Sequence, residues 1–359
     1  GQLYRKNGNW QQLGATLTRA LEVAVADVDR KEILTELGEL LDSQMGQTDQ
    51  AITYFQRALE VDGSFIAAIE NLERIYAAQG KNRELVDVLT RKVGALEEPS
   101  EIAATKLRIG ALNEQMQDTQ RAAQTYREVI EIEPNNLQGL RGLARVYEAL
   151  EQWSELVKVL ESELEVVTTE RERIDILMQL AHIHEEQFRK PDVAAARLEQ
   201  VLEIDPNHEE AYFALERCYR KLRQWTELIN VYERHISATL DRKTKVDLYG
   251  AIAQVYADEI DDAQQAIDAY RNIVDLDDTS FDVIVTLSPD IVDLDDTNLP
   301  ALEALSKLYD KVGDASQSID YMTRVAELTQ DTKQRVESFY KTGKALDEKL
   351  GDRVSAQDR

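Results

Sequence analysis

Four histidines and one cysteine are the residues best suited to metal binding or nucleophilic catalysis, and their spacing favours neither. His182 and His184 are two residues apart in a segment with a helical pattern, so their side chains point about 200° apart and do not chelate one metal ion. Cys218 lies on an apolar stripe beside Tyr219 and Leu222, which predicts a small buried side chain. The sequence contains no HExxH, CxxC, GxSxG or glycine-rich phosphate motif. We therefore expect a protein that is not an enzyme and that holds no metal and no cofactor.

The charge balance narrows the class of partner. The 359-residue chain has 42 basic and 68 acidic residues, and its net charge is −26. A field of that sign repels phosphate backbones, so we expect no nucleic-acid partner. No apolar run is long enough to cross a bilayer and no signal peptide opens the chain, so we expect a soluble protein without membrane insertion; its compartment stays unknown. The acidic groups at 275–278 and 293–296 lack an EF-hand pattern and are interpreted as solvated helix ends.

Against this acidic background, basic residues recur at one position of a helical pattern. Arg74, Arg145, Arg217 and Lys307 each stand two residues after a leucine of the apolar stripe. Three- and four-residue spacing adds four more basic residues to this face: Arg141, Arg220, Lys221 and Lys311. One hypothesis is a peptide-binding face that prefers acidic segments, in which charge reversal weakens binding and leaves stability nearly unchanged. The other is pairing within each helix, since Glu70 and Arg74 are spaced i, i+4.

An internal repeat positions these residues. Trp10, Asn82, Trp153 and Trp225 are each followed three residues later by leucine, in steps of 72, 71 and 72 residues. A second column contains Tyr54, Tyr126, Leu198 and Tyr270, and a third contains Gly38, Gly110, Ala181 and Ala253. Apolar residues at three- and four-residue spacing, with breaks at Pro and Asn, predict four helices in each 72-residue unit. The prediction is an all-α solenoid of about 18 helices in antiparallel hairpins. Its units are 10–81, 82–152, 153–224, 225–314 and a partial 315–350, between flexible tails at 1–9 and 351–359.

The helix pairs are similar to those of a known family. The pattern from Leu180 and Ala181 through Ala194 and Leu198 to Pro206 resembles the tetratricopeptide repeat, and the resemblance covers about residues 10–350. It implies a right-handed solenoid whose first helices line a concave face. The leading hypothesis is a protein–protein interaction scaffold that binds a partner segment, possibly acidic, along that face. The alternatives are a structural spacer or an array that packs end to end at uncapped termini, and an enzyme-associated adaptor with no chemistry of its own; the oligomeric state stays open.

An 18-residue insertion interrupts the fourth unit. The seven residues 273–279 recur at 291–297, and removing 280–297 restores the repeat. The inserted residues 281–287 are rich in β-branched side chains and lack the helical period. We expect a surface loop, or an exposed strand to which a partner adds its own strand, or a SUMO-interacting motif. The candidate strand residues are Phe281, Val283, Ile284, Val285 and Leu287.

Overall fold

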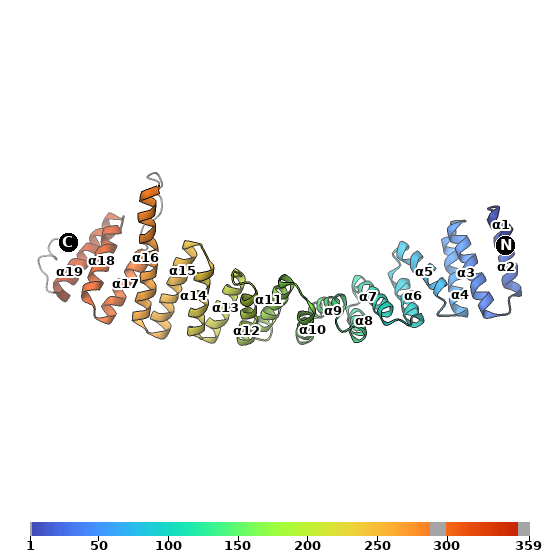
Figure 1. The fold of residues 1–359 in the computed structure, drawn as a ribbon, viewed down its shortest axis with the longest axis horizontal. Coiled ribbons are helices and arrows are strands. Elements are labelled where there is room, and N and C mark those ends of the chain that lie inside the picture. Colours follow the sequence, from blue (N-terminus) through green and yellow to red (C-terminus); the bar gives the residue numbers. More distant parts are fainter. Residues whose placement is uncertain (1, 288–298, 351–359) are drawn as a thin grey trace. The chain divides into compact units, whose positions relative to one another are not determined.

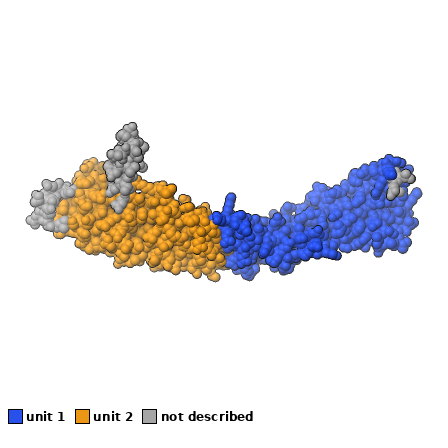
Figure 2. Space-filling view, in the orientation of Figure 1, with its two compact units in different colours: residues 1–176 blue, residues 177–359 orange. Residues whose placement is uncertain are grey.

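The computed structural model describes residues 2–287 and 299–350 (Figure 1). All regular secondary structure in these two ranges is helical, and they contain no strand. The chain divides into two compact units, Gly1–Ile176 and Leu177–Arg359 (Figure 2), and the division falls within α11. In the part of the chain that the structure describes, no helix is both long and apolar enough to cross a bilayer. The all-α solenoid predicted from the sequence is confirmed.

The helices form two alternating sets, which we call A-helices and B-helices. The A-helices are α3 (Asp27–Ser43), α5 (Ile66–Gln79), α7 (Pro99–Gln115), α9 (Leu137–Ala149), α11 (Glu170–Glu186), α13 (Glu209–Leu222), α15 (Arg242–Gln254), α17 (Leu299–Val312) and α19 (Thr332–Ala345). The B-helices are α2 (Trp10–Val23), α4 (Thr48–Val61), α6 (Asn82–Ala95), α8 (Thr119–Ile132), α10 (Trp153–Val166), α12 (Pro191–Ile204), α14 (Trp225–Ala238), α16 (Ala263–Leu287) and α18 (Ala315–Leu328). Along most of the chain an A-helix packs against the B-helix that follows it, as α3 does against α4 and α17 against α18. Two π-helical segments, Val255–Ile260 and Leu346–Leu350, continue α15 and α19. Each repeat unit thus joins a long and a short A-helix to two B-helices.

Short polar residues fix where the helices begin. The side chain of Asp118 accepts a hydrogen bond from the backbone N–H of Arg121 at the start of α8, and Asn136 does the same for Gly139 at the start of α9. These caps satisfy backbone donors that have no partner within the helix. Pro191 opens α12, where a missing N–H costs nothing. The breaks seen in the sequence therefore act as helix starts.

Close helix packing depends on glycines that face aromatic rings. A Cβ at Gly110 of α7 would lie 2.6 Å from the ring of Tyr126, and one at Gly142 of α9 would lie 2.5 Å from it. The ring of Tyr126 in α8 is thus held between two A-helices. In the first unit, Gly38 faces Phe55 instead, at 2.6 Å. The repeat column that contains Tyr126 should therefore begin at Phe55 and not at Tyr54. The prediction was wrong by one residue because four residues connect α3 to α4, whereas three connect α7 to α8.

The expected strand in the insertion is wrong. Residues 281–287, which include Phe281, Val283, Ile284, Val285 and Leu287, form the last turns of α16. A packed helix gains one hydrogen bond for each added residue, whereas a strand needs a partner, and the described residues contain no strand. This outweighs the weak β-propensity of the side chains. The surface loop expected over 280–297 is likewise wrong for residues 280–287, which are helical. Residues 288–298, with the second copy of the seven-residue repeat, lie outside the described residues, so the expected loop there stays a prediction.

The tail expected at residues 1–9 is also partly helical. Residues Gln2–Lys6 form α1, which contacts α2. Arg5 of α1 makes an ion pair with Glu36 of α3. This pairing gives the segment a fixed position that the polar composition did not predict. The second expected tail, 351–359, lies outside the described residues.

Candidate functional site

The basic stripe of the sequence is built into a series of ion pairs that we call the A-helix ladder. In each of the first three units, a carboxylate near the end of the long A-helix binds an arginine of the next A-helix. The pairs are Asp42 with Arg74 at 2.6 Å, Glu114 with Arg145 at 3.0 Å, and Glu185 with Arg217 at 2.6 Å. The partners are 31 or 32 residues apart in the chain. The ladder therefore ties neighbouring A-helices together, rather than pairing residues within one helix.

The two sides of the ladder differ in burial. The carboxylate side chains of Asp42, Glu114 and Glu185 are 11%, 25% and 2% exposed. Their arginine partners are 52% to 60% exposed. A guanidinium group has five N–H donors, so the donors that face solvent stay available to a ligand. The ladder is thus structural on its buried side and accessible on its basic side.

Glu185 carries the strongest pair. Arg217 contacts its two oxygens through Nε and Nη2, both at 2.6 Å, and Lys221 donates to it at 2.8 Å. The hydrogen bonds from Arg217, with a further contribution from Lys221, lower the pKa of Glu185 to about 2 although burial acts in the opposite direction. Burial raises the pKa of the adjacent Cys218 thiol to about 11, and the negative charge of Glu185 adds to this effect. Cys218 is fully buried, as predicted.

The lowered pKa of Glu185 predicts a pH-dependent contribution to stability. A carboxyl whose pKa falls on folding stabilises the protein above its unfolded-state pKa of about 4.3, and this contribution disappears as pH falls towards 2. Glu185→Gln is therefore expected to lower the free energy of unfolding most at neutral pH, and the difference from wild type should shrink between about pH 5 and pH 3. Urea titrations at several pH values measure it. The matched control is Glu186→Gln at the neighbouring half-exposed side chain; a difference for Glu185→Gln that does not change with pH would contradict the assignment.

Two of the sequence-predicted residues lie apart from the ladder. Arg141 of α9 binds Glu163 of α10 at 2.8 Å and Glu172 of α11 at 2.6 Å. Arg220 of α13 bonds Glu216 at 3.0 Å and the hydroxyl of Tyr232 in α14 at 2.9 Å. These contacts direct both arginines towards a neighbouring B-helix. Sequence spacing grouped them with the ladder because three- and four-residue steps cover a broad helical face.

The fourth unit breaks the ladder. Lys307 of α17 occupies the position of Arg217, but Ala257 stands where Glu185 stands in the third unit. Within the described residues Lys307 makes no ion pair, and it is exposed. One turn later, Lys311 binds Asp261 at 2.6 Å. Of the four residues at this repeat position, Lys307 is therefore the one that makes no ion pair with a described carboxylate of the preceding A-helix.

Lys307 lines a pocket between the A-helices α17 and α19. The pocket has a volume of about 450 Å³ and its base is formed by α18. Small polar side chains and three lysines surround it. The lining residues are Glu303, Ser306, Lys307, Asp310, Ser318, Met322, Val325, Ser338, Lys341, Thr342, Ala345 and Lys349. We call it the A-face pocket.

Two lysines of the A-face pocket were not predicted from the sequence as site residues. Lys349 makes an ion pair with Asp310, and Lys341 makes an exposed one with Glu337 at 2.9 Å. Extending the basic stripe by one further A-helix would have found them. Among the residues described, no group of three or more His, Cys, Asp or Glu side chains is arranged to hold a metal ion. The chemistry available here is recognition by charge and hydrogen bonds.

Comparison with known proteins identifies the repeats. Models described as tetratricopeptide repeat match residues 32–65, 68–103, 104–136, 140–174 and 211–246. No curated protein sequence matches the chain. The matches therefore recur along the chain in register with the helix pairs of the structure.

Solved structures with a similar arrangement include YrrB, titled a TPR protein with an unusual peptide-binding site, at 16% identity over 51% of this chain and 91% of that one, with a TM-score of 0.33. A tetratricopeptide repeat protein from Parabacteroides merdae is 13% identical, and the match covers 76% of this chain and 98% of that one, with a TM-score of 0.35. The C-terminal part of a TPR repeat-containing protein from Cytophaga hutchinsonii is 15% identical, and the match covers 71% of this chain and 99% of that one, with a TM-score of 0.37. Tetratricopeptide repeats are typical of protein–protein interaction scaffolds, usually without enzymatic activity. The five matched segments of this chain are therefore tetratricopeptide repeats.

Proposed function

We propose that the chain is a scaffold that binds a segment of another protein on its A-helices, and that the A-face pocket is its principal contact. One observation carries the proposal: Ala257 replaces the ladder carboxylate, so Lys307 faces the pocket without an ion pair among the described residues. An acidic side chain of the partner takes the place of the missing carboxylate. The bond formed is a charge-assisted hydrogen bond, which is stronger than one between neutral groups.

The lining of the A-face pocket supports an extended partner segment. Ser306, Ser338 and Ala345 are small, which leaves room for a peptide backbone to approach. The hydroxyl of Ser306 already donates to the carbonyl oxygen of Glu303 at 2.9 Å, so the hydroxyl of Ser338 is the serine donor for a carbonyl oxygen of the peptide. Met322 and Val325 provide an apolar base. The three lysines outnumber the two carboxylates in the lining, so the pocket has a local positive excess in a chain of net charge −26.

The ladder arginines act as secondary contacts. Arg74, Arg145 and Arg217 already bind a carboxylate of the chain, but more than half of each side chain is exposed. A partner carboxylate can bond the donors that the buried acid leaves free. Because these charges are partly compensated, we expect each to contribute less to binding than Lys307 does.

Binding of a labelled acidic peptide tests the proposed function. The probe is a fluorescein-labelled 12-residue peptide that repeats glycine, leucine, glutamate and serine. Its fluorescence anisotropy with the full chain is expected to show binding that Lys307→Glu weakens about tenfold, which equals roughly 1.4 kcal/mol. Lys333→Glu, at an exposed position of α19 outside the pocket, is the matched control and should have at most a small effect.

Two results would contradict the proposal. If the acidic probe does not bind more tightly than the same peptide with glutamine in place of glutamate, the structural-spacer hypothesis is favoured instead. If Lys307→Glu and Lys333→Glu weaken binding equally, the attraction is a general charge effect and the pocket is not the site.

A further inference from the structure

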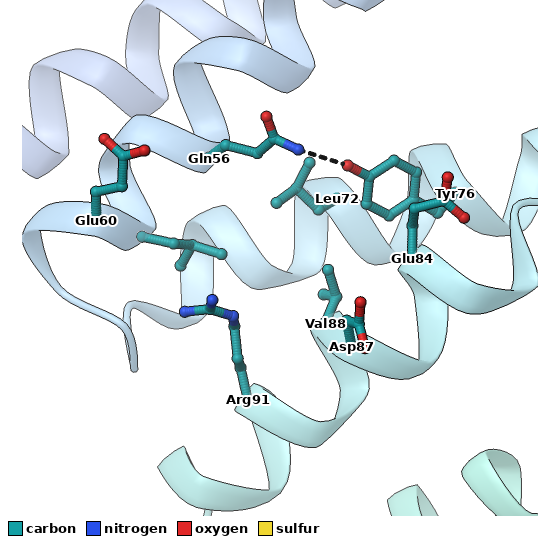
Figure 3. A pocket seen from close by; sticks show the side chains of 9 residues that line it. Gln56, Glu60, Leu72, Tyr76, Glu84, Asp87, Val88 and Arg91 are labelled. Carbon is teal, nitrogen blue, oxygen red and sulfur yellow. Dashed lines mark hydrogen bonds between the residues drawn. The ribbon is translucent and has the colours of Figure 1, made fainter.

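A second pocket lies between two B-helices where the first unit meets the second, away from the residues of the A-helix ladder. It has a volume of about 340 Å³ and is formed by α4, α5 and α6 (Figure 3). Its lining residues are Gln56, Leu59, Glu60, Leu72, Tyr76, Glu84, Asp87, Val88 and Arg91. We call it the B-face pocket.

The B-face pocket combines an apolar base with an acidic rim. Leu59, Leu72 and Val88 are 7%, 1% and 5% exposed, so they form a firm base that belongs to the core. The carboxylates of Glu84 and Asp87 come from α6; Glu84 lies beside the ring of Tyr76, and Asp87 lies next to Val88 (Figure 3). Neither makes an ion pair with any residue that the structure describes, nor does Glu60 on α4.

We propose that the B-face pocket binds a lysine or arginine side chain of a partner protein. The aliphatic stem of such a side chain packs on Leu59, Leu72 and Val88, while its charged end reaches the carboxylates of the rim. A neutral or acidic side chain gains the apolar contact but not the charge-assisted hydrogen bonds. This site goes beyond the proposed function, because it takes the opposite charge on a different set of helices.

The third unit and the start of the fourth contain the same pocket positions, and a guanidinium group contacts them there. Each residue 143 positions further along the chain is identical or similar, including Tyr219 for Tyr76 and Arg234 for Arg91. There Arg234 donates to Glu199 at 2.7 Å, and the hydroxyl of Tyr219 donates to the same carboxylate at 3.2 Å. The arrangement of a carboxylate, a tyrosine and aliphatic side chains therefore accommodates an arginine within this chain.

Two charge-changing substitutions separate this pocket from its counterpart 143 residues later. Gln56 stands where Glu199 stands, and its amide donates to the hydroxyl of Tyr76 at 3.1 Å (Figure 3). An amide does not attract Arg91 as a carboxylate attracts Arg234, and Arg91 forms no ion pair within the described residues. Position 87 also differs, with Asp87 in place of Asn230, which adds a charge to the rim. The first unit thus keeps its rim carboxylates available.

The surroundings of Tyr76 agree with a negative local field. Burial raises the pKa of its hydroxyl, and the negative charges of Glu84 and Asp87 raise it further. The same negative charges would attract a basic side chain that enters the pocket. Where the second unit meets the third, Lys158 occupies the position of Asp87 and pairs with Glu155 at 2.9 Å, so the chain supplies its own cation there.

The test uses a 12-residue fluorescein-labelled peptide that repeats glycine, leucine, lysine and serine, with the full chain. Wild type is expected to bind it more tightly than the peptide with glutamine in place of lysine. Glu84→Gln with Asp87→Asn should weaken binding about tenfold. The matched control removes two charges from the third unit, Glu203→Gln with Glu227→Gln, and should weaken binding less than twofold. Equal losses for the two double variants would show a general attraction to the acidic chain and overturn the proposal.

A second variant separates pocket binding from simple charge. Gln56→Glu copies the third unit, so the new carboxylate is expected to draw Arg91 across the pocket and to weaken binding of the lysine peptide at least threefold. General electrostatics predicts the reverse, because the substitution adds a negative charge. Unchanged or tighter binding by Gln56→Glu would overturn the proposal. Lys307→Glu should leave the lysine peptide unaffected, so failure of the A-face pocket and failure of the B-face pocket are distinguishable.

Discussion

Charge reversal at Arg217 is expected to lower the free energy of unfolding by about 3 kcal/mol. The side chain of Glu185 is 2% exposed and depends on Arg217 for two hydrogen bonds at 2.6 Å. Arg217→Glu would place a second carboxylate against it and leave Lys221 as the remaining cation. An uncompensated buried charge is costly because water no longer solvates it. Thermal or urea unfolding followed by circular dichroism measures the loss.

Lys307→Glu is the matched comparison, because Lys307 occupies the same repeat position without a buried carboxylate opposite. Its effect on unfolding is expected to stay within about 0.5 kcal/mol. The sequence-based expectation that reversal at Arg217 leaves stability nearly unchanged does not take account of its partner in α11. If Arg217→Glu proves as stable as Lys307→Glu, the ion pair of Arg217 does not contribute to the stability of the fold.

Replacing both Gly110 and Gly142 by alanine is expected to cost about 3 kcal/mol of stability. Alanine normally favours a helix over glycine by about 1 kcal/mol, so the sign depends on the packing. Here the new methyl groups would lie 2.6 Å and 2.5 Å from ring atoms of Tyr126. The ring cannot move aside freely, because it is 2% exposed and its hydroxyl donates to Glu114. The same unfolding experiments measure the change.

A compensating change within the chain provides the control. The third unit has Ala181, Leu198 and Ala214 at the three equivalent positions, so leucine fits between two alanines there. Adding Tyr126→Leu to the double alanine variant should therefore recover most of the lost stability. Failure of the triple variant to recover would mean that the loss does not come from the contact with the ring. A stabilised double variant would show that the two A-helices separate at little cost.

The repeat and its helices could be predicted from the sequence because both follow from short-range rules. Apolar residues at three- and four-residue spacing encode a buried stripe, and a period of 72 residues repeats that stripe along the chain. The burial of Cys218 and the helix start near Asn136 depend on neighbours within one or two turns. Such features need no knowledge of distant contacts, and the structure agrees with them.

Other expectations failed where a neighbouring element decided the outcome. The one-residue error at Tyr54 came from a loop whose length changes the register of α4 and not that of α3. The strand expected at residues 281–287 followed local propensity, whereas the packed helix α16 continues through them because each further residue closes a hydrogen bond. Propensity is a weak effect, and an adjoining element easily overrides it.

The sequence by itself determined which residues share a face of the repeat, and the tertiary structure decided which of them are already bound. Spacing placed Arg74, Arg217 and Lys307 at one position, but the carboxylates that pair with the two arginines lie 32 residues earlier in the chain. In the same way, Gln56 and Arg91 lie on different helices, and only packing brings them to one pocket. Helical periodicity indicates the direction in which a side chain points from the axis of its own helix. Charge compensation depends on the helix opposite, which the period of a single helix does not specify.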